Sequence, residues 1–98
     1  MNNQKRGYVY ILFKMENGAL YTGMSTDITK RVYEHKTKAV DGFTSRYGIH
    51  KLGYYEVFDR VEDAIVREKQ IKHYKRWKKL RLINGMNPQR RDLYEDFE

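Results

Sequence analysis

The sequence contains no cysteine, a single proline and no long hydrophobic run. Without cysteine, disulfides, thiolate-bound zinc and cysteine nucleophiles are excluded, and any metal must be held by oxygen or imidazole ligands. The three histidines, at positions 35, 50 and 73, also lack the short spacing of a zinc hydrolase. Because no stretch approaches the roughly 18 apolar residues of a membrane span and no secretory cleavage signal is visible, we expect a cytoplasmic protein without membrane contact.

Positive charge is what the chain has in excess. Its 98 residues suit one compact domain. All twenty Lys and Arg side chains lie in residues 1–91 against nine acids, which leaves this part near +11, while the end of the chain, DLYEDFE, is acidic. A basic domain of this kind is expected to bind a polyanion.

The densest positive charge lies between residues 67 and 81, where eight Lys and Arg side chains meet one acid, Glu68, with Tyr74 and Trp77 between them. A solvated helix face is the alternative interpretation, but the charge density and the aromatics favour nucleic acid, with DNA expected and RNA as a second option. The side chains expected to contact it are Lys69, Lys72, Lys75, Arg76, Lys78 and Lys79.

Residue patterns predict a small α+β domain, with a three-stranded, mainly antiparallel sheet flanked by helices in the order β-β-α-β-α-α. The predicted strands are residues 7–13, 19–23 and 51–58, the first two joined by a turn at Asn17-Gly18. The predicted helices are residues 28–36, 61–74 and 76–83.

Polar residues before two of these helices predict their N-caps. Ser25, Thr26 or Asp27 is expected to cap residues 28–36, and Asp59 the helix that follows the third strand. Residues 36–50 contain two glycines and no clear period, which predicts a loop.

Alternation along residues 7–13 predicts two different faces of the first strand. Val9 and Ile11 are expected to face the core, while Tyr8 and Tyr10 face a cleft or a thin second layer. Tyr21 lies on the face of Tyr10 if the turn has two residues, and on the other face if it has three with a bulge. The sequence leaves both arrangements open.

Glu68 interrupts a hydrophobic helix face. Ala64, Ile65 and Ile71 have the spacing of a buried stripe, and Glu68 occupies the stripe position between them. A carboxylate there needs a cation, either a basic side chain or a metal.

Arg31 and His35 lie four residues apart and share a helix face beside the hydrophobic stripe. Taken singly, a surface salt bridge and a half-buried imidazole would explain them. Together with Glu68 and two tyrosines, that explanation requires several independent coincidences, which favours a shared site.

The order of these residues resembles the GIY-YIG endonuclease superfamily. Tyr8-Val9-Tyr10 corresponds to the first family tripeptide and Tyr21-Thr22-Gly23 to the second, with Tyr21 eleven residues after Tyr10. Tyr8 stands where the family name has glycine and Thr22 where it has isoleucine, while Met24 stands where some relatives carry a lysine.

Arg31, His35 and Glu68 follow in the family order, as in small stand-alone bacterial members that resemble the N-terminal domain of an excision-repair nuclease. The resemblance covers residues 6–85 as a nuclease-like domain and leaves residues 86–98 as an acidic tail.

The resemblance implies a metal-dependent endonuclease that hydrolyses phosphodiester bonds, with Glu68 holding Mg²⁺ or Mn²⁺. It assigns Tyr10 as the general base on water, although a phenol of ordinary pKa near 10 needs nearby positive charge for that task. Arg31 is then suited to bind phosphate oxygens, and Tyr21 is suited to position the phosphate or the base. His35 is suited to polarise a tyrosine or to move a proton. Asn87 is a weaker candidate for the metal shell.

Because so small a module offers few base-reading side chains, we expect selectivity for DNA structure, a link to repair or recombination, and a protein partner that supplies further specificity. Two alternatives remain at this point: a nucleic-acid-binding module of the same fold with little or no catalysis, and an interaction protein whose acidic tail docks on a neighbour's basic face.

Overall fold

The computed structural model describes residues 6–15, 18–38 and 42–97, and it confirms the predicted α+β fold. Three strands form one antiparallel sheet in the order β2-β1-β3. The strands are β1 (Gly7–Phe13), β2 (Leu20–Ser25) and β3 (Lys51–Phe58). The helices are α1 (Ile28–Lys36), α2 (Phe43–Tyr47), α3 (Val61–Lys72), α4 (Arg76–Met86) and the 3-10 helix η1 (Leu93–Phe97).

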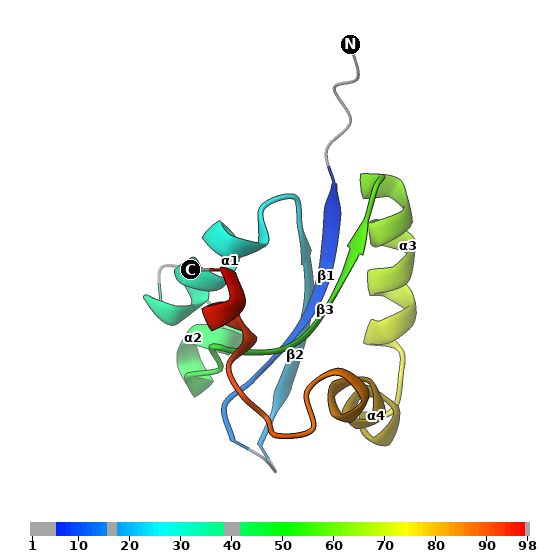
Figure 1. Ribbon diagram of the computed structural model, residues 1–98. Helices are drawn as coiled ribbons and strands as arrows, with labels where there is room; N and C mark the ends of the chain where they lie inside the picture. Colours follow the sequence, from blue (N-terminus) through cyan, green and yellow to red (C-terminus); the bar gives the residue numbers. More distant parts are fainter. Residues whose placement is uncertain (1–5, 16–17, 39–41, 98) are drawn as a thin grey trace.

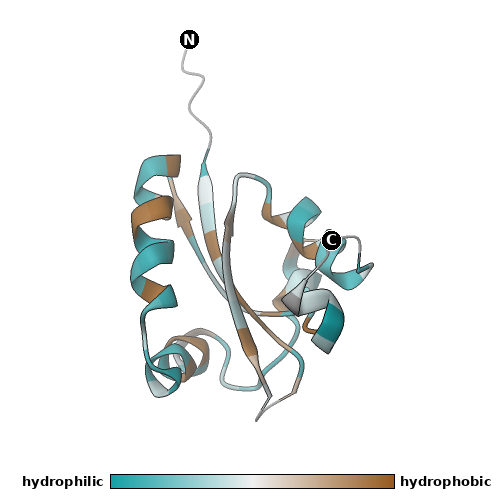
Figure 2. Ribbon diagram, turned by 180° about the vertical axis from the view of Figure 1, so that it is seen from behind, coloured by the Kyte–Doolittle hydropathy of each residue, from teal (hydrophilic) through white to brown (hydrophobic). Residues whose placement is uncertain are grey.

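The sheet lies between two layers of helices. Helices α1, α2 and η1 cover one face, and α3 and α4 cover the other (Figure 1). The strands carry much of the hydrophobic sequence, whereas the helices are mostly hydrophilic with isolated hydrophobic segments (Figure 2). Among the described residues, no helix is both long and apolar enough to cross a lipid bilayer.

Each face of the sheet packs its own core, and the alternation predicted for β1 is confirmed. Val9 and Ile11 pack under α3 and α4 with Ala64 and Ile71. The tyrosine face also forms a core, because α1, α2 and η1 cover it. Its buried members are Tyr10, Leu12, Ile28, Val32, Ile49, Leu52 and Leu93.

The strand register decides the question that the turn left open. Tyr10 pairs with Gly23 and Leu12 pairs with Tyr21, so Tyr10 and Tyr21 lie on the same face of the sheet. Asn17 of the predicted Asn17-Gly18 turn lies outside the described residues.

Of the two predicted helix caps, one is confirmed and the other is wrong. Asp27 caps α1, its side chain accepting a hydrogen bond from the Lys30 amide at 3.1 Å. The prediction of Asp59 as the cap of α3 was wrong: the Arg60 carbonyl accepts the first helical bond, from Ala64, so Arg60 is the cap residue and no side chain caps the helix.

Two further predictions also need correction. Residues 36–50 contain α2, a helix of five residues, too short for a hydrophobic period to reveal; it ends at Gly48, whose φ of 66° is a left-handed conformation suited to glycine. Ile65 does not belong to the buried stripe of α3, since 36% of it is exposed.

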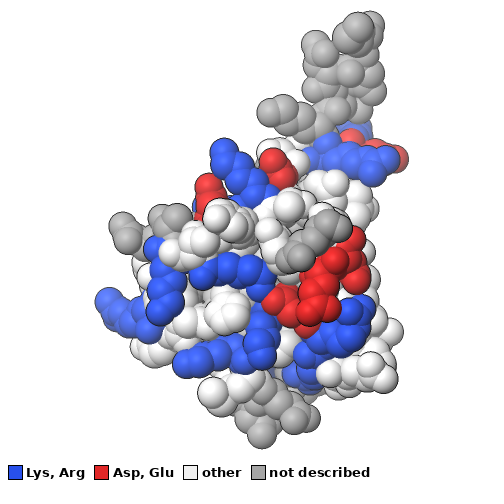
Figure 3. Space-filling view, turned by 60° about the vertical axis from the view of Figure 1, so that its left-hand side comes forward, with Lys and Arg blue, Asp and Glu red and all other residues white. Residues whose placement is uncertain are grey.

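The acidic end of the chain packs against the tyrosine face. Leu93 is buried in that core, and the ring of Phe97 lies 5.1 Å from that of Tyr55. Asp92 accepts a hydrogen bond from the Leu52 amide at 2.9 Å and pairs with Lys36. On this side of the molecule the acids gather in patches among widely spread Lys and Arg side chains (Figure 3).

Candidate active site

Tyr10 lies on the central strand, and its ring crosses the edge strand β2 above Gly23. A Cβ atom at position 23 would lie 2.5 Å from the Tyr10 hydroxyl, so only glycine leaves room for the phenol. The ring is 1% exposed, and its centroid lies 6.5 Å from that of Tyr21. Gly23 therefore accommodates Tyr10 within the protein.

His35 connects Tyr10 to α2. Its Nε2 lies 3.3 Å from the Tyr10 hydroxyl, and its Nδ1 lies 2.8 Å from Oγ1 of Thr44. The imidazole is 2% exposed, and this burial, together with the charge of Arg31, lowers the pKa of His35 to about 4. His35 is consequently a neutral imidazole at neutral pH.

Thr44 is a site residue that the sequence did not reveal. It is buried, and its hydroxyl bonds the one ring nitrogen of His35 that Tyr10 does not contact. A threonine inside a segment without a hydrophobic period carries no signal of such a contact. Only the packing of α2 against α1 shows it.

Opposing effects act on the pKa of the Tyr10 hydroxyl. Burial raises the pKa of Tyr10 to about 12, the guanidinium of Arg31 beside it lowers that pKa, and the nearby Tyr21 and Glu68 add to the rise. Arg31 is thus a cation that acts on this phenol. Met24, which stands where some relatives carry a lysine, packs against the core on the other face of the sheet. The net result is a phenol that keeps its proton in the free protein.

Glu68 lies on α3, which covers the other face of the sheet. Its side chain is 19% exposed, pairs with Nζ of Lys72 at 3.3 Å, and its charge acts on the Tyr10 hydroxyl. Asn87 instead uses its side-chain amide on the backbone of Gly53 and Arg91.

The donor set defines what kind of metal can be held here. Within the described ranges, no group of three or more His, Asp and Glu side chains is placed to bind a metal. Mg²⁺ keeps several waters and is held by one or two carboxylates together with substrate phosphates. A single carboxylate at Glu68 fits a metal that is shared with the substrate, and it does not fit a closed protein site.

A polar groove lies beside Arg31. It has a volume of about 350 Å³ and is open to solvent, and the Arg31 that lines it also lowers the pKa of Tyr10. Arg31 also pairs with Glu34 at 3.1 Å, which keeps the guanidinium at the groove wall. The groove is lined by Ser25, Thr26, Asp27, Lys30, Arg31 and Glu34.

The basic residues predicted to bind nucleic acid are largely available on the surface of α3 and α4. Lys79 is half-buried, and burial followed by the charge of Lys72 lowers its pKa. Arg67, also part of the basic run, is held by Glu56 at 2.9 Å and is a structural cation. The exposed ones are Lys69, Lys72, Lys75, Arg76 and Lys78.

Two strand tyrosines lie on one face of this small α+β domain. An arginine and a histidine follow on the next helix, and a carboxylate on a later one. This combination defines a nuclease class. The sequence model of the GIY-YIG catalytic domain matches residues 6–84, and the chain belongs to the GIY-YIG family of nucleases.

Its relatives carry the name UPF0213. A UPF0213 protein of Staphylococcus saprophyticus is 40% identical over 77 residues, which cover 79% of this chain and 93% of the relative. One of Staphylococcus aureus is 42% identical over 77 residues, covering 78% and 92%. The solution NMR structure of a UPF0213 protein from Bacillus halodurans has a TM-score of 0.54 and 31% identity, and covers 86% of this chain and 88% of that one.

Proposed function

We propose that this protein is a divalent-metal-dependent endonuclease that hydrolyses phosphodiester bonds in DNA. The observation that carries the proposal is the buried chain of side chains from Tyr10 through His35 to Thr44, with Arg31 beside the phenol. Membership of a nuclease family supports the reaction class. A merely structural tyrosine would not need a neutral histidine and a guanidinium at its hydroxyl.

Arg31 binds the scissile phosphate in this proposal. Arg31 lines the polar groove and its charge lowers the pKa of Tyr10, so a phosphate in the groove would meet its fork of N–H donors close to the base. Arg31 then exchanges its ion pair with Glu34 for the phosphate. The ring centroid of Tyr21 lies 5.4 Å from that of His35, so Tyr21 helps to position the imidazole in this proposal.

The proton path follows the hydrogen bonds. The Thr44 hydroxyl accepts from Nδ1–H of His35, which leaves Nε2 to accept from the Tyr10 hydroxyl. As Tyr10 takes a proton from the attacking water, its own proton passes to His35. The path needs no stable phenolate, which the pKa of about 12 would oppose. The negative charge of an arriving phosphate favours the protonated imidazole.

Glu68 would hold Mg²⁺ or Mn²⁺ together with the phosphate. When bound, the metal supplies positive charge against the non-bridging and leaving oxygens. For this purpose Glu68 must release Lys72, and the pair is weak because half of the lysine side chain is exposed.

The substrate is proposed to be chosen by its shape, with a role in DNA repair or recombination and a protein partner that adds specificity. The exposed cations of α3 and α4 suit phosphate contacts, which position a duplex without reading its sequence. RNA is the second substrate to test.

A nucleic-acid-binding module with little or no catalysis is the second candidate, favoured by the protonated state of Tyr10 and by the pairing of Glu68 with Lys72. The deciding experiment incubates the purified protein with supercoiled plasmid, nicked duplex, flap and four-way junction DNA, and with matching RNA, with Mg²⁺, Mn²⁺ or EDTA. We expect metal-dependent cutting of at least one branched or nicked DNA. Tight binding of all substrates without any cutting would support the binding module instead.

A further inference from the structure

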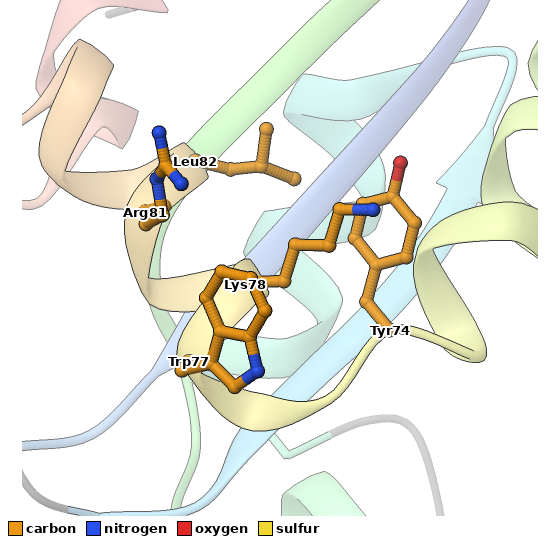
Figure 4. A pocket seen from close by; sticks show the side chains of 5 residues that line it. All are labelled: Tyr74, Trp77, Lys78, Arg81 and Leu82. Atoms are coloured by element: carbon orange, nitrogen blue, oxygen red, sulfur yellow. The ribbon is translucent and has the colours of Figure 1, made fainter.

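A second hollow lies away from the polar groove, where α3 is joined to α4. It has a volume of about 370 Å³ and is open to solvent. Figure 4 shows Trp77 and Lys78 side by side on α4, with the Lys78 side chain extending to the ring of Tyr74. The lining residues, here called the α4 pocket, are Tyr74, Trp77, Lys78, Arg81 and Leu82.

Helix geometry explains why these side chains meet. Trp77 and Arg81 are four residues apart, as are Lys78 and Leu82, so α4 presents two neighbouring rows to the same side. Leu82 and Tyr74 also pack against the core under α3 and α4. The α4 pocket therefore has an anchored floor and a cationic, aromatic rim.

The two aromatic rings of the pocket differ in their surroundings. Nζ of Lys78 lies 4.1 Å from the centroid of the Tyr74 ring, and Arg67 donates to the Tyr74 hydroxyl at 3.0 Å. Trp77 is 57% exposed, and within the described part of the chain no aromatic or cationic side chain is stacked on its indole. The indole is thus a free stacking surface between two cations, Lys78 and Arg81.

We propose that the α4 pocket holds an unpaired base of single-stranded DNA, stacked on Trp77, with the adjacent phosphates on Lys78 and Arg81. Aromatic stacking next to cations is the usual way in which proteins hold single strands. Bases inside a duplex are already stacked and do not reach such a pocket. The inference rests on the proposed function in taking DNA as the ligand, and it names the single-stranded part as the feature that is recognised.

Lys72 and Lys79 add positive charge near the junction of α3 and α4. Lys72 pairs with Glu68, and its charge lowers the pKa of Lys79, which adjoins Lys78 of the α4 pocket in sequence. These lysines offer further phosphate partners to a strand whose unpaired base is held on Trp77.

Because Trp77 is the single tryptophan of the chain, its fluorescence reports on the α4 pocket directly. The full-length protein is titrated in EDTA, so that nothing is cut, with three probes of about equal length: an oligothymidine, an abasic strand of the same charge, and a blunt duplex. We expect saturable quenching by oligothymidine, and none by the abasic strand or the duplex. Equal quenching by the abasic strand would overturn the stacked base, and so would binding of oligothymidine without quenching.

Variants test the energy of the stack by anisotropy of a labelled oligothymidine. Trp77→Ala should weaken binding about 5- to 150-fold, the range for loss of one base–aromatic stack, and Trp77→Phe should weaken it less. Tyr33→Ala removes an equally exposed aromatic on α1 and serves as the matched control, with unchanged affinity. Circular dichroism checks that each variant is folded. Equal affinities of Trp77→Ala and the parent protein would overturn the proposal.

The outcome for the α4 pocket is separable from that for the proposed function. Metal-dependent cutting without quenching of Trp77 would refute the pocket and leave the nuclease intact. Specific quenching by oligothymidine in a protein that cuts no substrate would support the pocket and refute the proposed catalysis.

Discussion

Replacing Tyr10 by phenylalanine removes one buried oxygen and keeps the ring. The ring is packed against Tyr21 and lies over Gly23, and none of this packing needs the hydroxyl. The hydroxyl contributes one hydrogen bond to His35, at the long distance of 3.3 Å. Because the substitution leaves the buried Nε2 of His35 without this partner, the free energy of unfolding should fall by about 1–3 kcal/mol. For a domain of this size each 1 kcal/mol lowers Tm by about 4–8 °C.

The expected effect on cleavage is much larger. Loss of a general base typically costs about 10²- to 10⁴-fold in rate, which corresponds to about 3–5 kcal/mol of barrier. Single-turnover cleavage of the preferred DNA, measured well below the lower Tm, separates this effect from unfolding. A loss of stability of about 1–3 kcal/mol cannot account for a rate loss of that size, because the variant stays folded at the assay temperature.

Tyr8→Phe provides the matched control. Tyr8 lies on the same face of β1 and packs partly on the same core, but no proposed catalytic contact depends on its hydroxyl. Tyr21→Phe should lose less activity than Tyr10→Phe, because Tyr21 is proposed to position and not to transfer protons. If Tyr10→Phe cleaves within a few-fold of Tyr8→Phe, the assignment of Tyr10 as the base is wrong.

Three other changes test the remaining parts of the site. Glu68→Gln should abolish cutting while DNA binding persists and Tm stays level or rises, since a partly desolvated carboxylate is removed; equal cutting by variant and parent would contradict the metal role. Thr44→Val should lower the free energy of unfolding by about 1–3 kcal/mol in urea denaturation and slow cleavage, with Thr44→Ser close to the parent in both; unaltered cleavage by Thr44→Val would argue against positioning of the imidazole. Reversing the charge of Lys72, Lys75 and Lys79 should weaken DNA binding and reduce its salt dependence by about one counterion per lost phosphate contact, and an unchanged salt slope would place the DNA elsewhere.

Strand and helix patterns predicted most of the secondary structure, because these patterns depend on residues that are close together in the sequence. The aromatic and β-branched run of β1 and β3 has few alternatives to a strand, and the stretch of α1 has apolar residues at helical spacing. Local patterns could not predict whether Tyr10 and Tyr21 lie on the same face of the sheet, because one more residue in the turn would move Tyr21 to the other face. The register of the paired strands settles it.

Contacts between distant segments limited what the sequence could reveal of the site. The bond between Thr44 and His35 depends on how α2 sits against α1. Likewise, Arg67 looks like any other cation of the basic run, and only the fold shows its carboxylate partner, Glu56, on the neighbouring strand. The predicted catalytic roles of Tyr10 and Glu68 remain predictions.

The packing of the acidic end has a practical consequence for anyone who prepares this protein in shortened form. The family match ends at residue 84, yet Leu93 fills the tyrosine-face core, and Asp92 neutralises Lys36 and accepts from the Leu52 amide. A version trimmed to the match would expose apolar surface and leave these polar groups without their partner. Poor expression or lack of activity of such a fragment would reflect a damaged fold, and would say nothing about the chemistry of the intact chain.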